Sequence, residues 1–395
     1  MTPVLDLNRY HCSAVIDWLE FRFCTFTEHQ SLNVQKVAAR FLGELGARST
    51  VFVSGPERQP GYQGSDFLVR VQDPQPRRFY LFLEALHDRY AARADDVGKV
   101  QISGVEVAVD FRVADTGSIS PAERDHLRWQ MTEVLRRHIR PEPVLTDLDR
   151  NWPRYYTEKQ ARHTAQYWVD TKLRAPSALL HRATLLGLDG RVAAPLSLEA
   201  HNQPPLDLTS YIGAKEAPIM LRIMDKISDR RDPEKKCSVP LEAEHKRSRI
   251  EVSLKGDWDK IGGAGAVGLQ TIGDLYGYDF KQHRKPLFEF FLPTVDLAAS
   301  GRLPPPASLS EMEAFQRTGV YGLDRVHRAL ASIHHAEWAK KRRSTRPVRL
   351  GKKGRLLSYV ELNQKVDRAL RSLSRRWESP CMRIVGTPGP KSKAL

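Results

Sequence analysis

Several segments of the chain have the two-residue alternation of a β-strand, and segments with helical spacing lie between them. The clearest strand is residues 15–26, VIDWLEFRFCTF. Alternation divides its residues between two faces, with Val15, Asp17, Leu19, Phe21 and Phe23 on one and Ile16, Trp18, Glu20 and Arg22 on the other. Such a strand buries one face and must pair in a sheet, which is the strongest restriction on the fold.

The other predicted elements interleave strands and helices along the chain. Helices are predicted at 31–46, at 79–94, and from the capping box Ser120–Glu123 to about Arg140. Further strands are predicted at 49–55, 66–72, 100–114 (a strand pair or one long strand), 208–226 (a hairpin) and 247–256. Because these elements lack the regular spacing of β-α-β units, the sequence predicts an α+β fold, an antiparallel sheet with flanking helices.

Proline and charge divide the chain into a body and a C-terminal part. Residues 1–300 are predicted to form the α+β body, with a polar and aromatic insertion near 141–207. A stiff linker at 301–307 contains three consecutive prolines. A small helical, basic module is predicted at 308–379, its last helix opened by the capping box Ser358–Glu361, and residues 380–395 form a tail.

The positive charge of the chain lies almost entirely near its C-terminus. From Lys340 to Leu395 there are 17 Lys and Arg against three acids, a net charge of +14 in a chain whose total is +15. Clustered cations neutralise phosphates and release counterions, so we expect DNA as the partner. The predicted DNA-binding residues are Lys340, Lys341, Arg342, Arg343, Arg346, Arg349, Lys352, Lys353 and Arg355.

The basic segment has two other interpretations. A solvated tail that only keeps the protein in solution is the alternative to DNA binding. A helix lying on a membrane surface is disfavoured, because Pro347, Gly351 and Gly354 interrupt the segment and it has no apolar face.

The sequence favours a cytoplasmic protein without a membrane partner. No apolar run approaches the roughly 20 residues that span a bilayer, and the first residues lack the pattern of a signal peptide. The cysteines, Cys12, Cys24, Cys237 and Cys381, are isolated, with no Cys-x-x-Cys pair for zinc or redox chemistry. They are expected to be free thiols in a reducing compartment.

Three predicted strands carry charged residues at positions that share a face. Glu106 and Asp110 are four residues apart in the first of them. Arg222, Met224 and Lys226 share a face of the second, and Arg249, Glu251, Ser253 and Lys255 share a face of the third. Carboxylates there can ligate a divalent cation while the bases neutralise a phosphodiester. The alternative is that these are only the solvent-facing sides of amphipathic strands.

Five segments in order resemble the Rep_trans family of rolling-circle replication initiators and relaxases, which includes plasmid and filamentous-phage initiators. They are Asp17–Phe23 (DWLEFRF), Gly61–Tyr62, Gly104–Asp110 (GVEVAVD), the hairpin Tyr211–Lys226, and Arg249–Gly256 (RIEVSLKG). The resemblance covers roughly residues 15–256.

The resemblance implies metal-dependent nicking of a DNA origin that is single-stranded or extruded. A divalent cation, Mg²⁺ or Mn²⁺, held by Glu106, Asp110 and Glu251 polarises the scissile phosphate. A tyrosine then attacks, giving a 5′-phosphotyrosyl enzyme and a free 3′-hydroxyl that primes synthesis. Cations such as Arg222 and Lys226 favour the phenolate. Host helicase and polymerase would be further partners.

The chain departs from the family pattern at the nucleophile. The family's tyrosine position is Met224, and a thioether cannot attack phosphorus. The catalytic strand also has Gly104 and Glu106 where the family has Arg and Asp. We predict Tyr211 as the substitute nucleophile, on the expectation that a two-residue hairpin loop pairs it with Met220. Tyr155 and Tyr156 are the alternatives, and each tyrosine is open to a packing or base-stacking role instead.

Three classes of function therefore stay open at this point. The first is an origin-nicking endonuclease. The second is a non-catalytic DNA-binding relative, or replication regulator, that keeps the scaffold. The third is a structural or RNA-binding protein whose basic tail binds any polyanion. Neither the oligomeric state nor the origin sequence follows from the residues.

Overall fold

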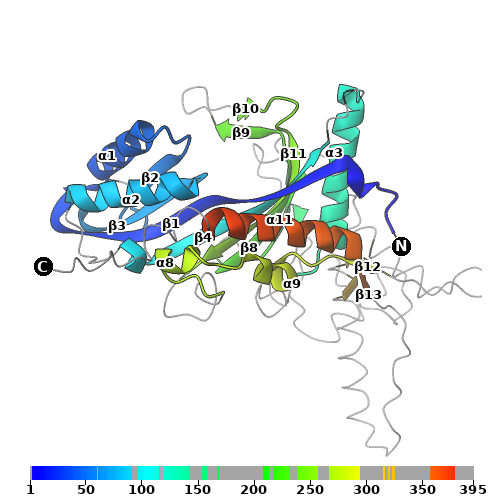
Figure 1. Ribbon diagram of the computed structural model, residues 1–395. Coiled ribbons are helices and arrows are strands. Elements are labelled where there is room, and N and C mark those ends of the chain that lie inside the picture. The colour runs from blue at the N-terminus through cyan, green and yellow to red at the C-terminus, as the bar shows by residue number, and fades with distance from the viewer. Residues whose placement is uncertain are drawn as a thin grey trace, which may run out of the picture.

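The computed structural model has one nine-stranded antiparallel sheet with helices packed against it (Figure 1). It describes residues 2–59, 61–90, 97–114, 117, 119–141, 154–157, 167–168, 208–213, 217–231, 238–256, 267–293, 315, 319–320, 323–324 and 356–378. The strand order is β2-β3-β1-β4-β11-β8-β7-β5-β6. An α+β fold with an antiparallel sheet and flanking helices is thus confirmed.

The central strands are long and the edge strands short. Their bounds are β1 (Tyr10–Gln30), β2 (Thr50–Ser54), β3 (Gln63–Gln72), β4 (Ile102–Val113), β5 (Arg154–Thr157), β6 (Tyr167–Trp168), β7 (Leu208–Ile212), β8 (Ile219–Lys226) and β11 (Arg247–Lys255). Two small pairs complete the strands, β9 (Ser228–Arg231) with β10 (Ser238–Pro240), and β12 (Phe291–Pro293) with β13 (Leu356–Ser358).

Four long helices cover one face of the sheet: α1 (Ser31–Glu44), α2 (Pro76–Tyr90), α3 (Pro121–His138) and α11 (Val360–Glu378). Short helical turns are η1 (Leu7–Arg9), η2 (Val97–Lys99), α8 (Ile272–Leu275), η4 (Phe280–His283) and α9 (Arg284–Leu287). Helix α3 begins as the capping box predicts, with Pro121 in its first turn and the Ser120 hydroxyl accepting from the Glu123 amide at 3.2 Å.

Alternation assigns the apolar residues of the sheet to the face under the helices. Val105, Val107, Val109 and Phe111 of β4 are at most 1 % exposed there, and Ile250, Val252 and Leu254 of β11 are fully buried. The other face carries the charged residues of the same strands. The sheet therefore has a helical face and a polar face, terms used below in this sense.

Helix α11 belongs to the body and not to a separate C-terminal module. It packs along β1, and Leu362, Val366, Leu370 and Trp377 lie in the same core as the sheet. The Trp377 ring contacts Phe79 of α2, with ring centroids 6.1 Å apart. The 301–307 linker, the 380–395 tail and most of the predicted 308–379 module lie outside the described residues. In the described part of the chain, no helix is both long and apolar enough to cross a membrane.

Two buried histidines make the stability of this body dependent on pH. Burial lowers the pKa of His283 to about 4, and among the described residues neither of its ring nitrogens has a hydrogen-bond partner. Burial also lowers the pKa of His138 to about 4, although its Nδ1 donates to the Phe291 carbonyl at 2.7 Å. The unfolded chain binds these protons near pH 6.5 and the folded chain only near pH 4.

We expect the free energy of unfolding to fall as the pH drops from 6.5 to 4, by about 3 kcal/mol for each histidine. Replacing His283 by Leu should remove one proton from this dependence. Urea unfolding at several pH values measures the slope. An unchanged slope in His283→Leu would contradict the assignment.

Candidate metal centre on the polar face of the sheet

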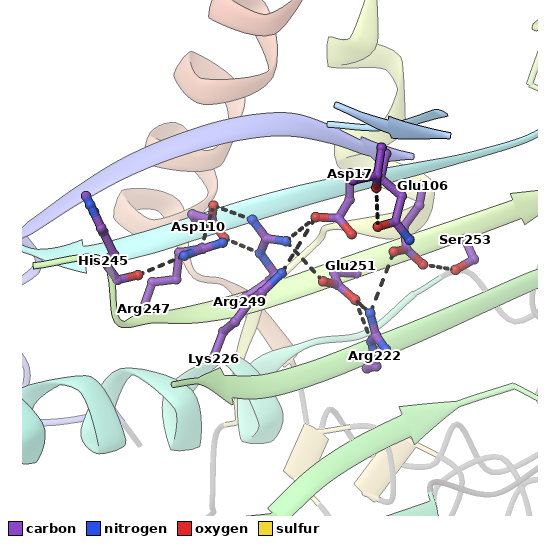
Figure 2. A network of polar contacts seen from close by, with 12 residues as sticks. Asp17, Glu106, Asp110, Arg222, Lys226, His245, Arg247, Arg249, Glu251 and Ser253 are labelled. Atoms are coloured by element: carbon purple, nitrogen blue, oxygen red, sulfur yellow. Dashed lines mark hydrogen bonds and ion pairs between the residues drawn. The ribbon is translucent and has the colours of Figure 1, made fainter. Parts of the chain in front are cut away.

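The polar face of β1, β4, β11 and β8 carries a continuous network of buried charges (Figure 2). Direct cross-strand pairs build it, because residues opposite each other in antiparallel strands share a face. Arg249 lies opposite Asp110 and Met224, and Glu251 lies opposite Arg222. Glu106, Asp110, Arg249 and Glu251 are each at most 3 % exposed.

Three carboxylates in this network come together as a group that can hold a metal ion. One oxygen each of Asp17, Glu106 and Glu251 lies within 4.8 Å of the other two. Two oxygens bound to one divalent cation lie about 4–5 Å apart at most, so this spacing fits a shared Mg²⁺ or Mn²⁺. Asp17, Glu106 and Glu251 are called the carboxylate triad below.

Asp17 reaches the triad because β1 is irregular at this position. Ile16 lies opposite Val107 and Trp18 opposite Glu106, so Asp17 is the additional residue of a β-bulge. The bulge brings both Asp17 and Trp18 to the polar face, although uninterrupted alternation would separate them. Sequence reasoning placed Asp17 on the face of Leu19 and therefore missed it as a ligand.

The raised pKa of Glu106 indicates that neighbouring cations do not fully compensate the negative charge of the triad. Burial and then the neighbouring Glu251 raise its pKa to about 7, so the carboxyl is half protonated at neutral pH. Ser253 donates a hydrogen bond to it. A divalent cation bound by all three carboxylates would displace that proton, so the donor set fits a hard cation.

Cations surround the triad from β8 and β11. Arg222 donates to Glu251 and lies 3.7 Å from Glu106, and Arg249 donates to Asp17 and to Glu251, the latter at 3.2 Å. Burial opposes ionisation of Asp17, but Arg249 and Lys226 outweigh it and hold the pKa of Asp17 below its usual value. Arg222 is 31 % exposed, which leaves it room to turn toward a phosphate.

Asp110, the third ligand expected from sequence, is on the polar face but outside the triad. Arg249 binds both of its oxygens, at 2.5 and 2.7 Å, and Arg247 lies 3.1 Å away. Its carboxylate is therefore occupied by guanidinium groups and holds Arg249 in place. Of the three expected ligands, Glu106 and Glu251 are in the triad, and Asp17 takes the place assigned to Asp110.

Tyr211, the expected nucleophile, lies next to the triad's cations. It is directly opposite Arg222 and half-buried, so it shares the polar face with Arg222 and Lys226. The expected pairing with Met220 is wrong, because the register differs by two residues. An even difference leaves Tyr211 on the face of Arg222 and Lys226.

The remaining predicted residues are further from this centre or are not described. Met224 is opposite Arg249 on the polar face, two residues from Arg222. Strand β5 brings Tyr156 opposite Thr209 of β7, close to Tyr211 along the chain. All nine predicted DNA-binding residues between Lys340 and Arg355 lie outside the described residues, and so does most of the 141–207 insertion.

Comparison with known proteins assigns neither a family nor an activity to this chain. No protein-family model matches this chain, and no curated protein matches it at a significant level. The class of site is therefore defined by its own geometry, a carboxylate triad flanked by Arg222, Arg249 and Lys226, with Tyr211 opposite Arg222. That combination can bind a cation and a phosphate together.

Proposed function

We propose that the protein is a DNA-nicking replication initiator of the rolling-circle type, using a divalent cation at the carboxylate triad. The observation that supports this most is the joint placement of Asp17, Glu106 and Glu251 within one cation's reach, beside Arg222, which lies opposite Tyr211. Carboxylates for a metal, guanidinium for phosphate and a phenol are what a phosphodiester transesterification needs.

The proposed reaction exchanges one phosphodiester for another. The Tyr211 oxygen attacks phosphorus, the bond from phosphorus to the 3′ oxygen breaks, and a 5′-phosphotyrosyl link forms. The phenolic proton leaves to solvent and the departing 3′ oxygen gains one. Arg222 stabilises the negative charge on the attacking phenolate and on the phosphate, while Lys226 holds Asp17 at 3.8 Å. The cation, when bound, polarises the phosphate.

The Tyr211 hydroxyl is expected to be essential for nicking and unnecessary for folding. A supercoiled plasmid carrying the DNA that flanks the gene should become open circular with Mn²⁺ or Mg²⁺ and stay supercoiled with EDTA. Tyr211→Phe should lower the rate at least about 1,000-fold, because the nucleophile is removed. Tyr62→Phe, in the β2–β3 turn, serves as the control. Equal nicking by Tyr211→Phe and the wild-type protein would contradict the assignment.

A non-catalytic DNA-binding protein is the second candidate, and Met224 favours it. The resemblance requires a tyrosine there, and the thioether opposite Arg249 cannot replace it. In that case the same network would act as a scaffold that binds DNA without cleaving it. Met224→Tyr separates the two candidates, since it should create metal-dependent nicking in a protein that otherwise has none.

A further inference from the structure

An exposed phenylalanine lies on the polar face of the edge strand β2. Phe52 is 51 % exposed, whereas its neighbours Val51 and Val53 are 5 % and 7 % exposed on the helical face. An aromatic side chain half in water contributes little to the core, and the residue directly opposite Phe52 on this face is the charged Arg70. Phe52 is therefore free to stack on a flat partner.

A buried acid, Glu20, fixes two arginines in position at this end of the sheet. Arg70 lies directly opposite Phe52 and opposite Glu20. Glu20, 3 % exposed, accepts from Arg70 at 2.6 and 3.0 Å and from Arg58 at 2.9 Å. Arg58 is 50 % exposed and has a φ of 60°, a backbone conformation uncommon for arginine.

The surface continues from these arginines to the carboxylate triad. The Arg70 guanidinium lies over the Trp18 ring at 4.2 Å, and Trp18 is opposite Glu106. Gly104 makes room for Trp18, because a Cβ there would come within 3.0 Å of the indole. Phe52 and Glu106 are three strand spacings apart, about 15 Å. A short stretch of single strand spans that distance.

We propose that the β2–β3–β1 end of the polar face binds single-stranded DNA beside the scissile phosphate, with a base stacked on Phe52 and its phosphates held by Arg58 and Arg70. This inference rests on the proposed function and deepens it by assigning the path of the strand. Alternating aromatic and cationic groups are suited to single strands, since every base has a π-face and duplex bases are already stacked.

The proposal predicts a loss of affinity that needs no metal and no cleavage. With EDTA, a fluorescein-labelled oligodeoxythymidine of about 16 nucleotides should bind Phe52→Ala about 5- to 100-fold more weakly than the wild-type protein. Phe52→Trp should restore binding. Leu32→Ala, which truncates a 55 % exposed apolar residue on the helical side, is the matched control and should bind normally. Arg58→Gln should reduce the dependence of log affinity on log salt by about one phosphate contact.

The outcomes separate this inference from the proposed function. Equal affinity of Phe52→Ala and the wild-type protein, or an equal loss in Leu32→Ala, would overturn the inference while leaving the nicking assay untouched. Weaker binding by Phe52→Ala without any covalent adduct in the wild-type protein would keep the strand path and refute nicking. Circular dichroism of each variant shows whether lost binding comes from lost folding.

Discussion

Replacing Glu251 by glutamine should reduce metal-dependent nicking about 100- to 1,000-fold, the largest effect expected for any single side chain other than the nucleophile. Glu251 is fully buried, belongs to the triad and accepts from both Arg222 and Arg249. Glutamine keeps its shape but loses the charge that a divalent cation requires, and a metal contributes several kcal/mol to stabilising the transition state.

Mn²⁺ binding, followed by electron paramagnetic resonance, should weaken together with nicking in Glu251→Gln. Glu44→Gln is the matched control, because Glu44 on α1 is 62 % exposed and belongs to neither of the carboxylate groups of the described residues that could hold a metal ion. Unchanged metal affinity in Glu251→Gln, in a protein whose unfolding is also unchanged, would remove the triad as the metal centre.

Arg249→Met should lower the free energy of unfolding by about 3–5 kcal/mol, the largest effect on stability expected in the network. Arg249 is 2 % exposed and donates to Asp17, Asp110 and Glu251, so its loss leaves Asp17 and Asp110 without their closest partner and Glu251 with Arg222 alone. Burial opposes its charge, yet Asp110 and then Asp17 outweigh burial and raise the pKa of Arg249 well above its usual value. Urea unfolding measures the difference.

The destabilisation by Arg249→Met should shrink at acid pH. Without Arg249 the folded protein binds protons on the carboxylates more readily than the unfolded chain does, so lowering the pH favours folding of the variant relative to the wild-type protein. Arg222→Met is the comparison, since Arg222 is 31 % exposed and its loss should cost less. If Arg249→Met lowers the free energy of unfolding by less than about 1 kcal/mol, and by the same amount at neutral and at acid pH, the network is not held by this residue.

Alternation of apolar and polar residues was sufficient to predict most of the sheet. The predicted strand at 247–256 is β11, the segment at 100–114 is the single strand β4, and residues 31–46 contain α1. Parity within a strand also placed Glu106 with Asp110 and Arg249 with Glu251, because the pleat depends only on the local chain. These predictions needed no information about neighbouring strands.

Predictions that depend on pairing between strands failed where the ladder is irregular. Asp17 is in the triad because β1 has a bulge against β4, and a bulge is a property of the pair and not of one segment. Asp110 was expected to bind metal because a single strand does not show which residue it pairs with. In the sheet, pairing places Asp110 against Arg249. The sequence offered two signals for Asp17: an acid beside a tryptophan in an otherwise alternating strand, and its place at the start of the DWLEFRF segment.

The position of α11 in the fold also does not follow from the sequence of the helix alone. Its apolar stripe of Leu362, Val366, Leu370 and Trp377 predicts a helix with one buried face but does not say which partner it covers. The proline-containing linker suggested a separate module, whereas α11 packs on β1, more than 300 residues earlier in the sequence. Long-range packing of this kind follows from the whole core and not from the helix.

The most direct test of the proposed function is the identity of the tyrosine that becomes attached to DNA. The full-length protein would be incubated with Mn²⁺ and a pool of random-sequence single-stranded oligonucleotides, and adducts that survive denaturant would be digested and mapped by mass spectrometry. The account predicts a phosphotyrosyl link on Tyr211, absent with EDTA and absent in Tyr211→Phe. A link on Tyr155 or Tyr156, or no adduct with Mn²⁺, would contradict it.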